Sequence, residues 1–594
     1  MNIIPTLTAA QIRQHSSEDS YARGSSYSQE GRVGELILRD GRLYAAVEGS
    51  QYEPYQVTIS FDAGGVTSAE CTCPYDWGGW CKHIVAVLLT VSAAPELVEA
   101  RPPLSQLLEG HDRQQLVKLL TDLAQDSPAF AHAIELRLLI PTAPKATSPT
   151  VRRTPPDLSA FKKQLQNVFR SSSYERYDRY NRYDRYDYGN DTVLHELHTL
   201  LKQVDSFSDG GDAMGALVLL EPLTEQFSQS WAEYDQEGEL GDFFDQLGLS
   251  WAKAFLIGDL SLKERRAWVK KLQHWNESSD EYGFDGLSLA ILAAEQAWDD
   301  PQIMAVLQGK QQTLALDPME QQLLSLRLEV LQQQNRSDDY IKLARASGQY
   351  RDLALMLARQ GQQQEAVILA MKHFTSADEA LALAQLLREQ GQFDAAIEVA
   401  AHGLGLAEPR AKLGTWLLDV AAGLGNIALA LQAGEIALQS QPDLALYQRL
   451  HGLDEVGWPE RRERMLEHIR HSSNNWMSTA GSLDIFLHEG LIDDAIQLVS
   501  KHSDWNSLGR VMDAAISSRP EWVIRAATTQ AAEIINAGKA QHYDQAIAWL
   551  GRARAAYRAV GNLRGWETHV RELRAVHGRK YKLMGLLDAL EHRP

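Results

Sequence analysis

The chain is poor in cysteine: it has three in 594 residues, all between positions 71 and 81. So small, odd and clustered a set excludes a disulfide framework and is typical of a reducing compartment and a metal site. The sequence also lacks a long apolar run, because its longest one, residues 84–94, is shorter than the roughly 20 residues that span a bilayer. Residues 1–20 lack the charged start and apolar block of a secretory signal. We therefore expect a cytoplasmic protein without a membrane partner.

Common catalytic motifs are absent from the sequence. It has neither the G-x-x-x-x-G-K-[ST] phosphate loop nor the G-x-S-x-G nucleophile elbow. His195 and His198 are one position too close for the H-E-x-x-H zinc motif. A metal on the three cysteines would leave no thiol for nucleophilic catalysis. We therefore expect no enzymatic activity and no small-molecule substrate.

The chain also lacks an excess of basic charge. Its formal net charge is −20, and residues 1–100 hold 6 basic against 12 acidic residues. A whole-protein attraction to DNA or to an acidic membrane is therefore not expected. Basic charge gathers in residues 551–582, with 9 Lys and Arg against 2 acidic residues, while residues 221–250 hold 8 acidic residues and no basic ones.

Two interpretations of the basic segment remain open. We favour basic residues that lie on solvated helix faces and that also form internal ion pairs with the acidic block. The alternative is a docking surface for an acidic protein or a nucleic acid. The residues concerned are Arg552, Arg554, Arg558, Arg571, Arg574, Arg579, Lys580 and Lys582.

Residues 30–95 predict a small sheet followed by a helix. Asp40-Gly41 favours a two-residue hairpin turn, and residues 55–61 alternate apolar and polar side chains. A helix is expected to begin at His83 and to run to about Val91. The expected strands are residues 33–39, 42–47, 55–61 and 66–71.

The rest of the chain predicts mainly helices. Residues 96–140 form a helical extension, and residues 141–190 a linker whose Tyr/Arg tract, 171–190, we interpret as a disordered spacer rather than a cation–π segment. Residues 191–594 predict a helical-repeat array. Gly361, Gly391 and Gly425 each separate two helical stretches, at spacings near the 34 residues of tetratricopeptide repeats, which residues 376–440 resemble most. The expected fold is thus an α+β zinc-finger domain, residues 1–95, followed by a mostly all-α solenoid.

The cysteines belong to a metal-ligand pattern. Cys71-Thr72-Cys73, seven residues and Cys81-Lys82-His83 have the form C-x-C-x7-C-x-H. Three thiolates and one imidazole are an accepted tetrahedral ligand set for zinc, although another soft-ligand metal is not excluded by the residues. Residues i and i+2 of a strand point to the same side, so Cys71 and Cys73 can face one ion. Four protein ligands leave no place for a reacting water, so we predict one structural Zn²⁺.

This arrangement resembles the SWIM-type zinc finger, whose motif is C-x-C, a variable gap and C-x-H. The segment Ser20–Gly24, with Tyr27 and Gly31, and the segments Val47–Ser50 and Tyr55–Val57 look like the strands that precede the finger in bacterial members. The resemblance is clear over residues 15–95. It is weaker over 104–138 and 547–590, where the comparison is with long bacterial SWIM proteins.

The resemblance implies a DNA-binding or protein-interaction module of a kind that accompanies helicase-type ATPases and transposases. We therefore expect a zinc-binding, non-enzymatic scaffold or adaptor for protein partners, with an ATPase among the candidates. The alternative is a nucleic-acid-binding protein that uses the finger and the basic segments. Trp77 and Trp80 in the metal loop are candidates for contact with a partner, but such residues more often pack over the zinc site. Lys82 and Arg23 are candidates for a small basic patch.

Overall fold

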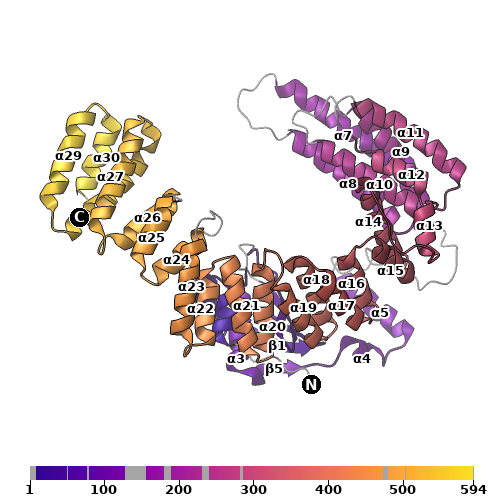
Figure 1. Ribbon diagram of the computed structural model, residues 1–594, viewed down its shortest axis with the longest axis horizontal. Helices are drawn as coiled ribbons and strands as arrows, with labels where there is room; N and C mark the ends of the chain where they lie inside the picture. Colours follow the sequence, from indigo (N-terminus) through magenta and orange to yellow (C-terminus); the bar gives the residue numbers. More distant parts are fainter. Residues whose placement is uncertain are drawn as a thin grey trace. The chain divides into compact units, whose positions relative to one another are not determined.

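The structure is a computed structural model (Figure 1). The chain divides into two compact units. Unit 1 combines Met1–Leu107 with Thr375–Pro594, and unit 2 is Leu108–Phe374. The predicted continuous array, 191–594, is therefore shared between the two units. The described residues are 8–49, 51, 53–75, 79–126, 156–179, 189–230, 240–280, 285–472, 479–501 and 504–592.

The finger domain of unit 1 is built on a five-stranded sheet of strand order β4-β3-β2-β1-β5. The hairpin turn between the first two strands has positive φ at both Asp40 (52°) and Gly41 (74°), as a type I′ turn requires. The four predicted strands are present and pair antiparallel in sequence order. Their bounds are β1 (Val33–Arg39), β2 (Arg42–Val47), β3 (Tyr55–Asp62) and β4 (Gly65–Cys71).

One face of this sheet packs on helix α3 (Lys82–Ala93). Alternate residues of β2 and β3 point to that face, as the period of two dictates. They meet the apolar side of α3 in a single core cluster. Its members include Leu43, Ala45, Val47, Val57, Ile59, Ile84, Val85, Val87, Leu88 and Val91, all buried.

Two parts of the finger domain differ from the sequence-based prediction. Residues 20–31, expected to resemble strands, belong mostly to helix α2 (Glu18–Gln29), which follows the short helix α1 (Ala9–Gln14). The prediction of strands there was wrong. Ser17 caps α2 by accepting a hydrogen bond from the Ser20 N–H, and acidic residues occupy the first turn, where they favour a helix start.

The sheet also extends beyond the predicted domain boundary at residue 95. A single 3₁₀ turn, η1 (Pro95–Leu97), leads into β5 (Val98–Ala100), which pairs parallel with β1. A three-residue strand has too little alternation to be recognised from sequence, and its pairing partner lies about 60 positions earlier.

The remainder of unit 1 is helical, and neighbouring helices pack against each other in pairs. The turn between α18 and α19 shows why glycine separates them: Gly391 has φ 75°, and the Gln392 N–H bonds the Leu387 carbonyl at 2.8 Å, which satisfies the end of α18. The helices are α18 (Ala377–Glu389), α19 (Phe393–Gly403), α20 (Ala411–Gly423), α21 (Ile427–Ser440), α22 (Leu444–Leu453), α23 (Trp458–Ser472), α24 (Thr479–His488), α25 (Ile492–Lys501), α26 (Trp505–Ala515), α27 (Pro520–Asn536), α28 (Tyr543–Ala559), α29 (Leu563–His577) and α30 (Tyr581–His592).

Helix α4 (Leu104–Leu108) ends at the division between the units, and described unit 2 is helical from α5 onward. Trp251 on α10 is fully buried in a core cluster of unit 2. The helices are α5 (Arg113–Asp126), α7 (Leu158–Arg179), α8 (Gly189–Asp209), α9 (Ala213–Ser230), α10 (Leu240–Ile257), α11 (Leu262–Asp280), α12 (Ser288–Gln296), α13 (Pro301–Leu307), α14 (Pro318–Gln333), α15 (Ser337–Ala346), α16 (Tyr350–Arg359) and α17 (Gln363–His373).

Helix α7 lies inside the segment that we predicted to be a linker, residues 141–190, and it includes the start of the Tyr/Arg tract. Phe161, Leu165 and Val168 recur at helical spacing and are buried in the core of unit 2, which explains the helix. Residues 127–155 and 180–188 of the predicted extension, linker and tract lie outside the described residues. Among the residues described, no helix is long and apolar enough to cross a membrane.

Candidate metal centre

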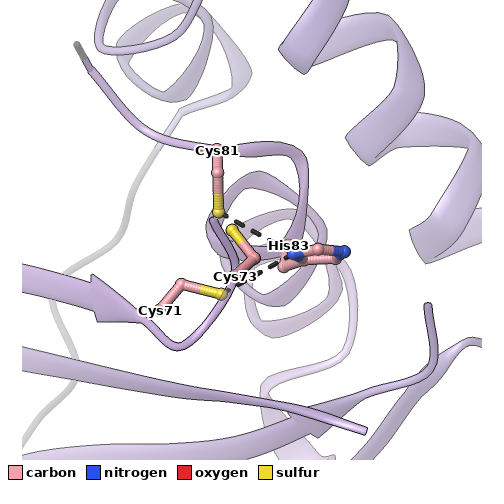
Figure 2. A group of neighbouring side chains, drawn as sticks. All are labelled: Cys71, Cys73, Cys81 and His83. Atoms are coloured by element: carbon pink, nitrogen blue, oxygen red, sulfur yellow. Dashed lines mark hydrogen bonds between the residues drawn. The ribbon is translucent and has the colours of Figure 1, made fainter. Parts of the chain in front are cut away.

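The end of strand β4 and the start of helix α3 place the four predicted ligands (Figure 2). Cys71 is the last residue of β4, and Cys73 lies two positions further along the chain. Cys81 is the N-cap residue of α3, and His83 lies in the first turn of that helix. The strand end and the helix start therefore present one ligand pair each, as the C-x-C and C-x-H spacing predicted.

The four ligand atoms lie within 4.8 Å of one another. The Sγ atoms of Cys71 and Cys81 lie 3.6 and 3.9 Å from Nδ1 of His83. Tetrahedral zinc with ordinary bond lengths separates two sulfurs by about 3.8 Å, and a sulfur from a nitrogen by about 3.6 Å. The cluster therefore fits one structural zinc ion, bound through Nδ1 of the histidine.

Hydrogen bonds and burial within the cluster shift the pKa values of the three thiols in opposite directions. The hydrogen bond from the Cys71 thiol, with help from His83 and the Ile84 backbone, outweighs burial and lowers the pKa of Cys81 to about 4. The same hydrogen bond to Cys81, together with burial, raises the pKa of Cys71, and burial raises that of Cys73. Cys81 is thus a ready thiolate at a helix N-terminus, whereas the other two thiols release their protons as metal binds.

Aromatic rings hold the imidazole in its orientation. His83 is buried, with Tyr55 stacked on it at 4.4 Å between ring centroids and Tyr27 tilted against it at 5.8 Å. A Cβ atom on Gly49 would lie 2.3 Å from the ring of Tyr55, so only glycine fits there. The sequence had pointed to Tyr27, Gly49 and Tyr55 only through the family resemblance.

Trp80, one of the two tryptophans proposed for partner contact, packs within the protein. Its backbone N–H donates to the His15 carbonyl at 2.6 Å, and its indole lies against the His15 imidazole with ring centroids 4.6 Å apart. It also contacts the core of the finger. Its ring contact is thus with His15, whereas the sequence favoured packing over the zinc site. Trp77, the second candidate, lies outside the described residues.

The two basic residues proposed for a patch on the finger are each paired within it. Lys82 donates to the Tyr27 hydroxyl at 2.9 Å, and its ammonium lies over the Tyr27 ring. Arg23 pairs with Asp19 at 3.0 Å, one turn earlier on α2. These contacts do not bring the Lys82 and Arg23 side chains together as a phosphate-binding pair.

Most of the C-terminal basic residues also have internal partners. Arg552, Arg574 and Lys582 form ion pairs, and Arg554 and Lys580 donate to backbone carbonyls at helix ends. The acidic partners in these ion pairs are Asp513, Asp544, Asp588 and Glu591, all within unit 1. Arg558, Arg571 and Arg579 are exposed.

The finger is joined to the helices of unit 1 by contacts that the sequence did not indicate. Arg388 on α18 forms a bidentate ion pair with Asp62 on β3. His15 lies 3.6 Å from the Asp419 carboxylate on α20, which pairs at 2.6 Å with buried Arg449 on α22. Because each finger residue is hundreds of positions away from its helical partner, no local sequence signal could have paired them.

Three thiolates and one imidazole, shared between a strand end and a helix start, define a Cys3His zinc finger. The SWIM zinc finger family matches residues 55–92, which contain all four ligands. The chain therefore carries a SWIM zinc finger, as the resemblance predicted.

Several curated relatives match part of this chain. The zinc finger SWIM domain-containing protein 8 homolog of Drosophila melanogaster is 32% identical over 126 residues, which are 21% of this chain and 6% of the relative. Zinc finger SWIM domain-containing protein 8 of Homo sapiens is 32% identical over 127 residues, 21% of this chain and 7% of the relative. This chain thus matches less than a tenth of the length of these relatives.

Among solved structures, one match is a circular tandem repeat protein with novel repeat topology and enhanced subunit contact surfaces. It is 14% identical and covers 73% of this chain and 94% of its own. The TM-score is 0.13, which is too low to support an argument about fold or function.

Proposed function

We propose that the chain is a zinc-stabilised adaptor that binds protein partners and catalyses no reaction. The observation that carries the proposal is the attachment of the finger to helices α18 and α20 through the Arg388–Asp62 ion pair and the contact of His15 with Asp419. The zinc site then stabilises a binding surface that the finger and the helices of unit 1 form together. Its four protein ligands fill a tetrahedral shell and leave no position for a reacting water.

The helices of unit 1 supply the larger part of that surface. Arrays of helix pairs present extended binding faces, because each pair contacts mainly its neighbours and leaves one side free. The family resemblance suggests an ATPase as one class of protein partner. Small residues at the contacts between helices, such as Gly414 against Ala437, fix the spacing of these faces.

A second candidate function, nucleic-acid binding, is favoured by one observation. Arg558, Arg571 and Arg579 are exposed near the C-terminus and could contact phosphates. Against it, the finger region carries a net acidic charge, Lys82 is hydrogen-bonded to Tyr27, and Arg23 forms a surface pair with Asp19.

Binding of labelled duplex DNA and single-stranded RNA to the zinc-loaded full chain separates the two functions. Phosphate contacts make affinity fall steeply between about 50 and 200 mM salt. We expect no detectable binding at the low end of that range. Tight binding that weakens with salt, and is lost when Arg558, Arg571 and Arg579 are all replaced by Ala, would overturn the adaptor proposal.

Affinity purification with mass spectrometry tests the adaptor function directly. The full chain is compared with Cys81→Ser, which removes a zinc ligand, and the extracts are treated with nuclease. We expect a reproducible set of proteins that the wild type retains and Cys81→Ser does not. Recovery of the same proteins by both chains would contradict a role for the zinc-fixed surface.

A further inference from the structure

A groove of about 580 Å³ lies where the finger meets the helices of unit 1. Helices α18, α20, α21 and α22 form its floor and sides, and His15 from the finger completes its wall. This volume is typical of sites that bind a ligand or a short segment of chain. The sequence analysis singled out none of its residues.

The lining of the groove suits an extended polypeptide. Gln385 and Gln441 are exposed at the groove, and each side-chain amide offers a donor and an acceptor that match those of a peptide group. Trp416 contributes an indole, a side chain enriched at the centre of protein interfaces. Small residues such as Ala411 and Ala445 allow a main chain to approach closely.

Two residues of α20 that line the groove, Trp416 and Asp419, are linked to the finger by side-chain contacts. The guanidinium of Arg388 lies 6.0 Å from the centroid of Trp416 and is itself paired with Asp62 of β3. Asp419, one turn further along α20, faces His15. A Cβ atom on Gly423 would lie 2.2 Å from the Gly64 carbonyl, so the end of α20 lies directly against the finger.

His15 is in turn held by the metal loop. Trp80, which precedes the ligand Cys81, donates its backbone N–H to the His15 carbonyl, and its ring lies tilted against the His15 ring. A Cβ atom on Gly79 would lie 2.7 Å from the same carbonyl, so the loop follows this backbone closely. The position of the wall residue His15 therefore depends on the loop that zinc closes.

We infer that this groove is a binding site for an extended polypeptide segment and that zinc, by fixing the metal loop against His15, completes its wall. The inference rests on the proposed adaptor function and gives it a location. It assigns Trp416, Gln385 and Gln441 to contact with the peptide. It assigns His15 and Arg388 to positioning the groove.

The test uses the zinc-loaded full chain and a phage-displayed library of random dodecapeptides. Enriched peptides are synthesised with a fluorescent label, and their affinity is measured by anisotropy. Trp416→Ala is expected to weaken binding about tenfold or more, as for a central interface tryptophan. Gln441→Ala, at an exposed position that leaves the fold intact, is expected to weaken it severalfold. Trp505→Ala, at an exposed tryptophan at the start of α26, is the matched control and should bind as the wild type does.

The role of zinc is tested with His15→Ala, which keeps the four ligands and the backbone carbonyl that Trp80 contacts. Elemental analysis should still find one zinc per chain in this variant, while peptide affinity falls severalfold. Chelation of zinc from the wild type should lower the affinity at least as much. Unchanged peptide affinity in both experiments would show that zinc does not position the wall of the groove.

The assignment of the peptide site to this groove is wrong if no peptide is enriched, or if enriched peptides bind Trp416→Ala and Gln441→Ala as they bind the wild type. Peptides that bind elsewhere on the chain would leave the adaptor function standing without the groove. Salt-sensitive binding of nucleic acid without peptide binding would contradict the adaptor function itself.

Discussion

Arg388 on helix α18 donates two hydrogen bonds to Asp62 on strand β3, with N–O distances of 2.6 and 2.8 Å, across 326 positions of sequence. Both side chains are largely removed from solvent, with 10% and 22% of their surface exposed. A bidentate pair in such a place fixes both distance and orientation between the modules. The finger is thereby a structural part of the helical unit.

Replacing Arg388 by Ala should loosen this attachment. The change leaves the Asp62 carboxylate without its charged partner, and we expect a loss of about 2 kcal/mol in the local stability of the interface. Hydrogen exchange of peptides from β3, β4 and α20 should report it. Arg510→Ala removes an exposed ion pair with Asp484 and should change local stability by less than about 1 kcal/mol. Equal exchange in both variants would show that the Asp62 pair contributes nothing.

Cys81→Ser should abolish stoichiometric zinc binding and destabilise residues 30–95. Cys81 supplies one of the four clustered ligand atoms, and the small finger core depends on the metal for stability. Elemental analysis and circular dichroism of the purified full chain provide the measurements. The control Glu70→Ser alters an exposed side chain next to Cys71 and should retain one zinc per chain. Wild-type zinc content in Cys81→Ser would refute the ligand assignment.

Gly24→Val should destabilise the packing of α2 on α3. A Cβ atom at this position would lie 2.6 Å from Cβ of Val85 and 2.8 Å from the Lys82 carbonyl, so the helices would have to separate. Overpacking of this kind costs about 1–3 kcal/mol. We expect faster hydrogen exchange in α3 and weaker zinc retention against a chelator. Ser26→Ala, at an exposed position of the same helix, should leave both measurements unchanged.

Acidification should weaken the contacts between α22, α23 and α24. Burial opposes ionisation of Glu489, but its hydrogen bonds with Arg462 and Tyr447 prevail and lower its pKa below the ordinary 4.5. A carboxyl with a depressed folded-state pKa contributes its full stability above the unfolded value and loses it as pH falls through the folded value.

Glu489→Gln should therefore be less stable than the wild type near neutral pH, and the difference should shrink as pH falls below about 4.5. Local stability from hydrogen exchange of α22–α24 at several pH values checks this. Glu463→Gln, at an exposed carboxyl near Arg462, is the control and should show little change. A difference that grows on acidification would contradict the assigned sign.

Local patterns predicted the parts of the fold whose partners are close in sequence. The hairpin at Asp40-Gly41, the strand from Tyr55 and the turn glycines such as Gly391 all follow from backbone preferences and alternation within a few residues. The same reasoning failed for residues 20–31. There the match to strands of the family came from residue types, while the Ser17 cap and the packing of Gly24 favour a helix.

By itself, the sequence determined the ligand set of the metal centre, because Cys71, Cys73, Cys81 and His83 lie within 13 consecutive residues and one turn brings them together. Only the tertiary structure determines which helices the finger contacts. The pairs Asp62–Arg388 and His15–Asp419 form only when the helices pack against the finger. The chain has 78 acidic residues, and it is packing and burial, not local sequence preference, that determine which carboxylate lies beside each of these side chains.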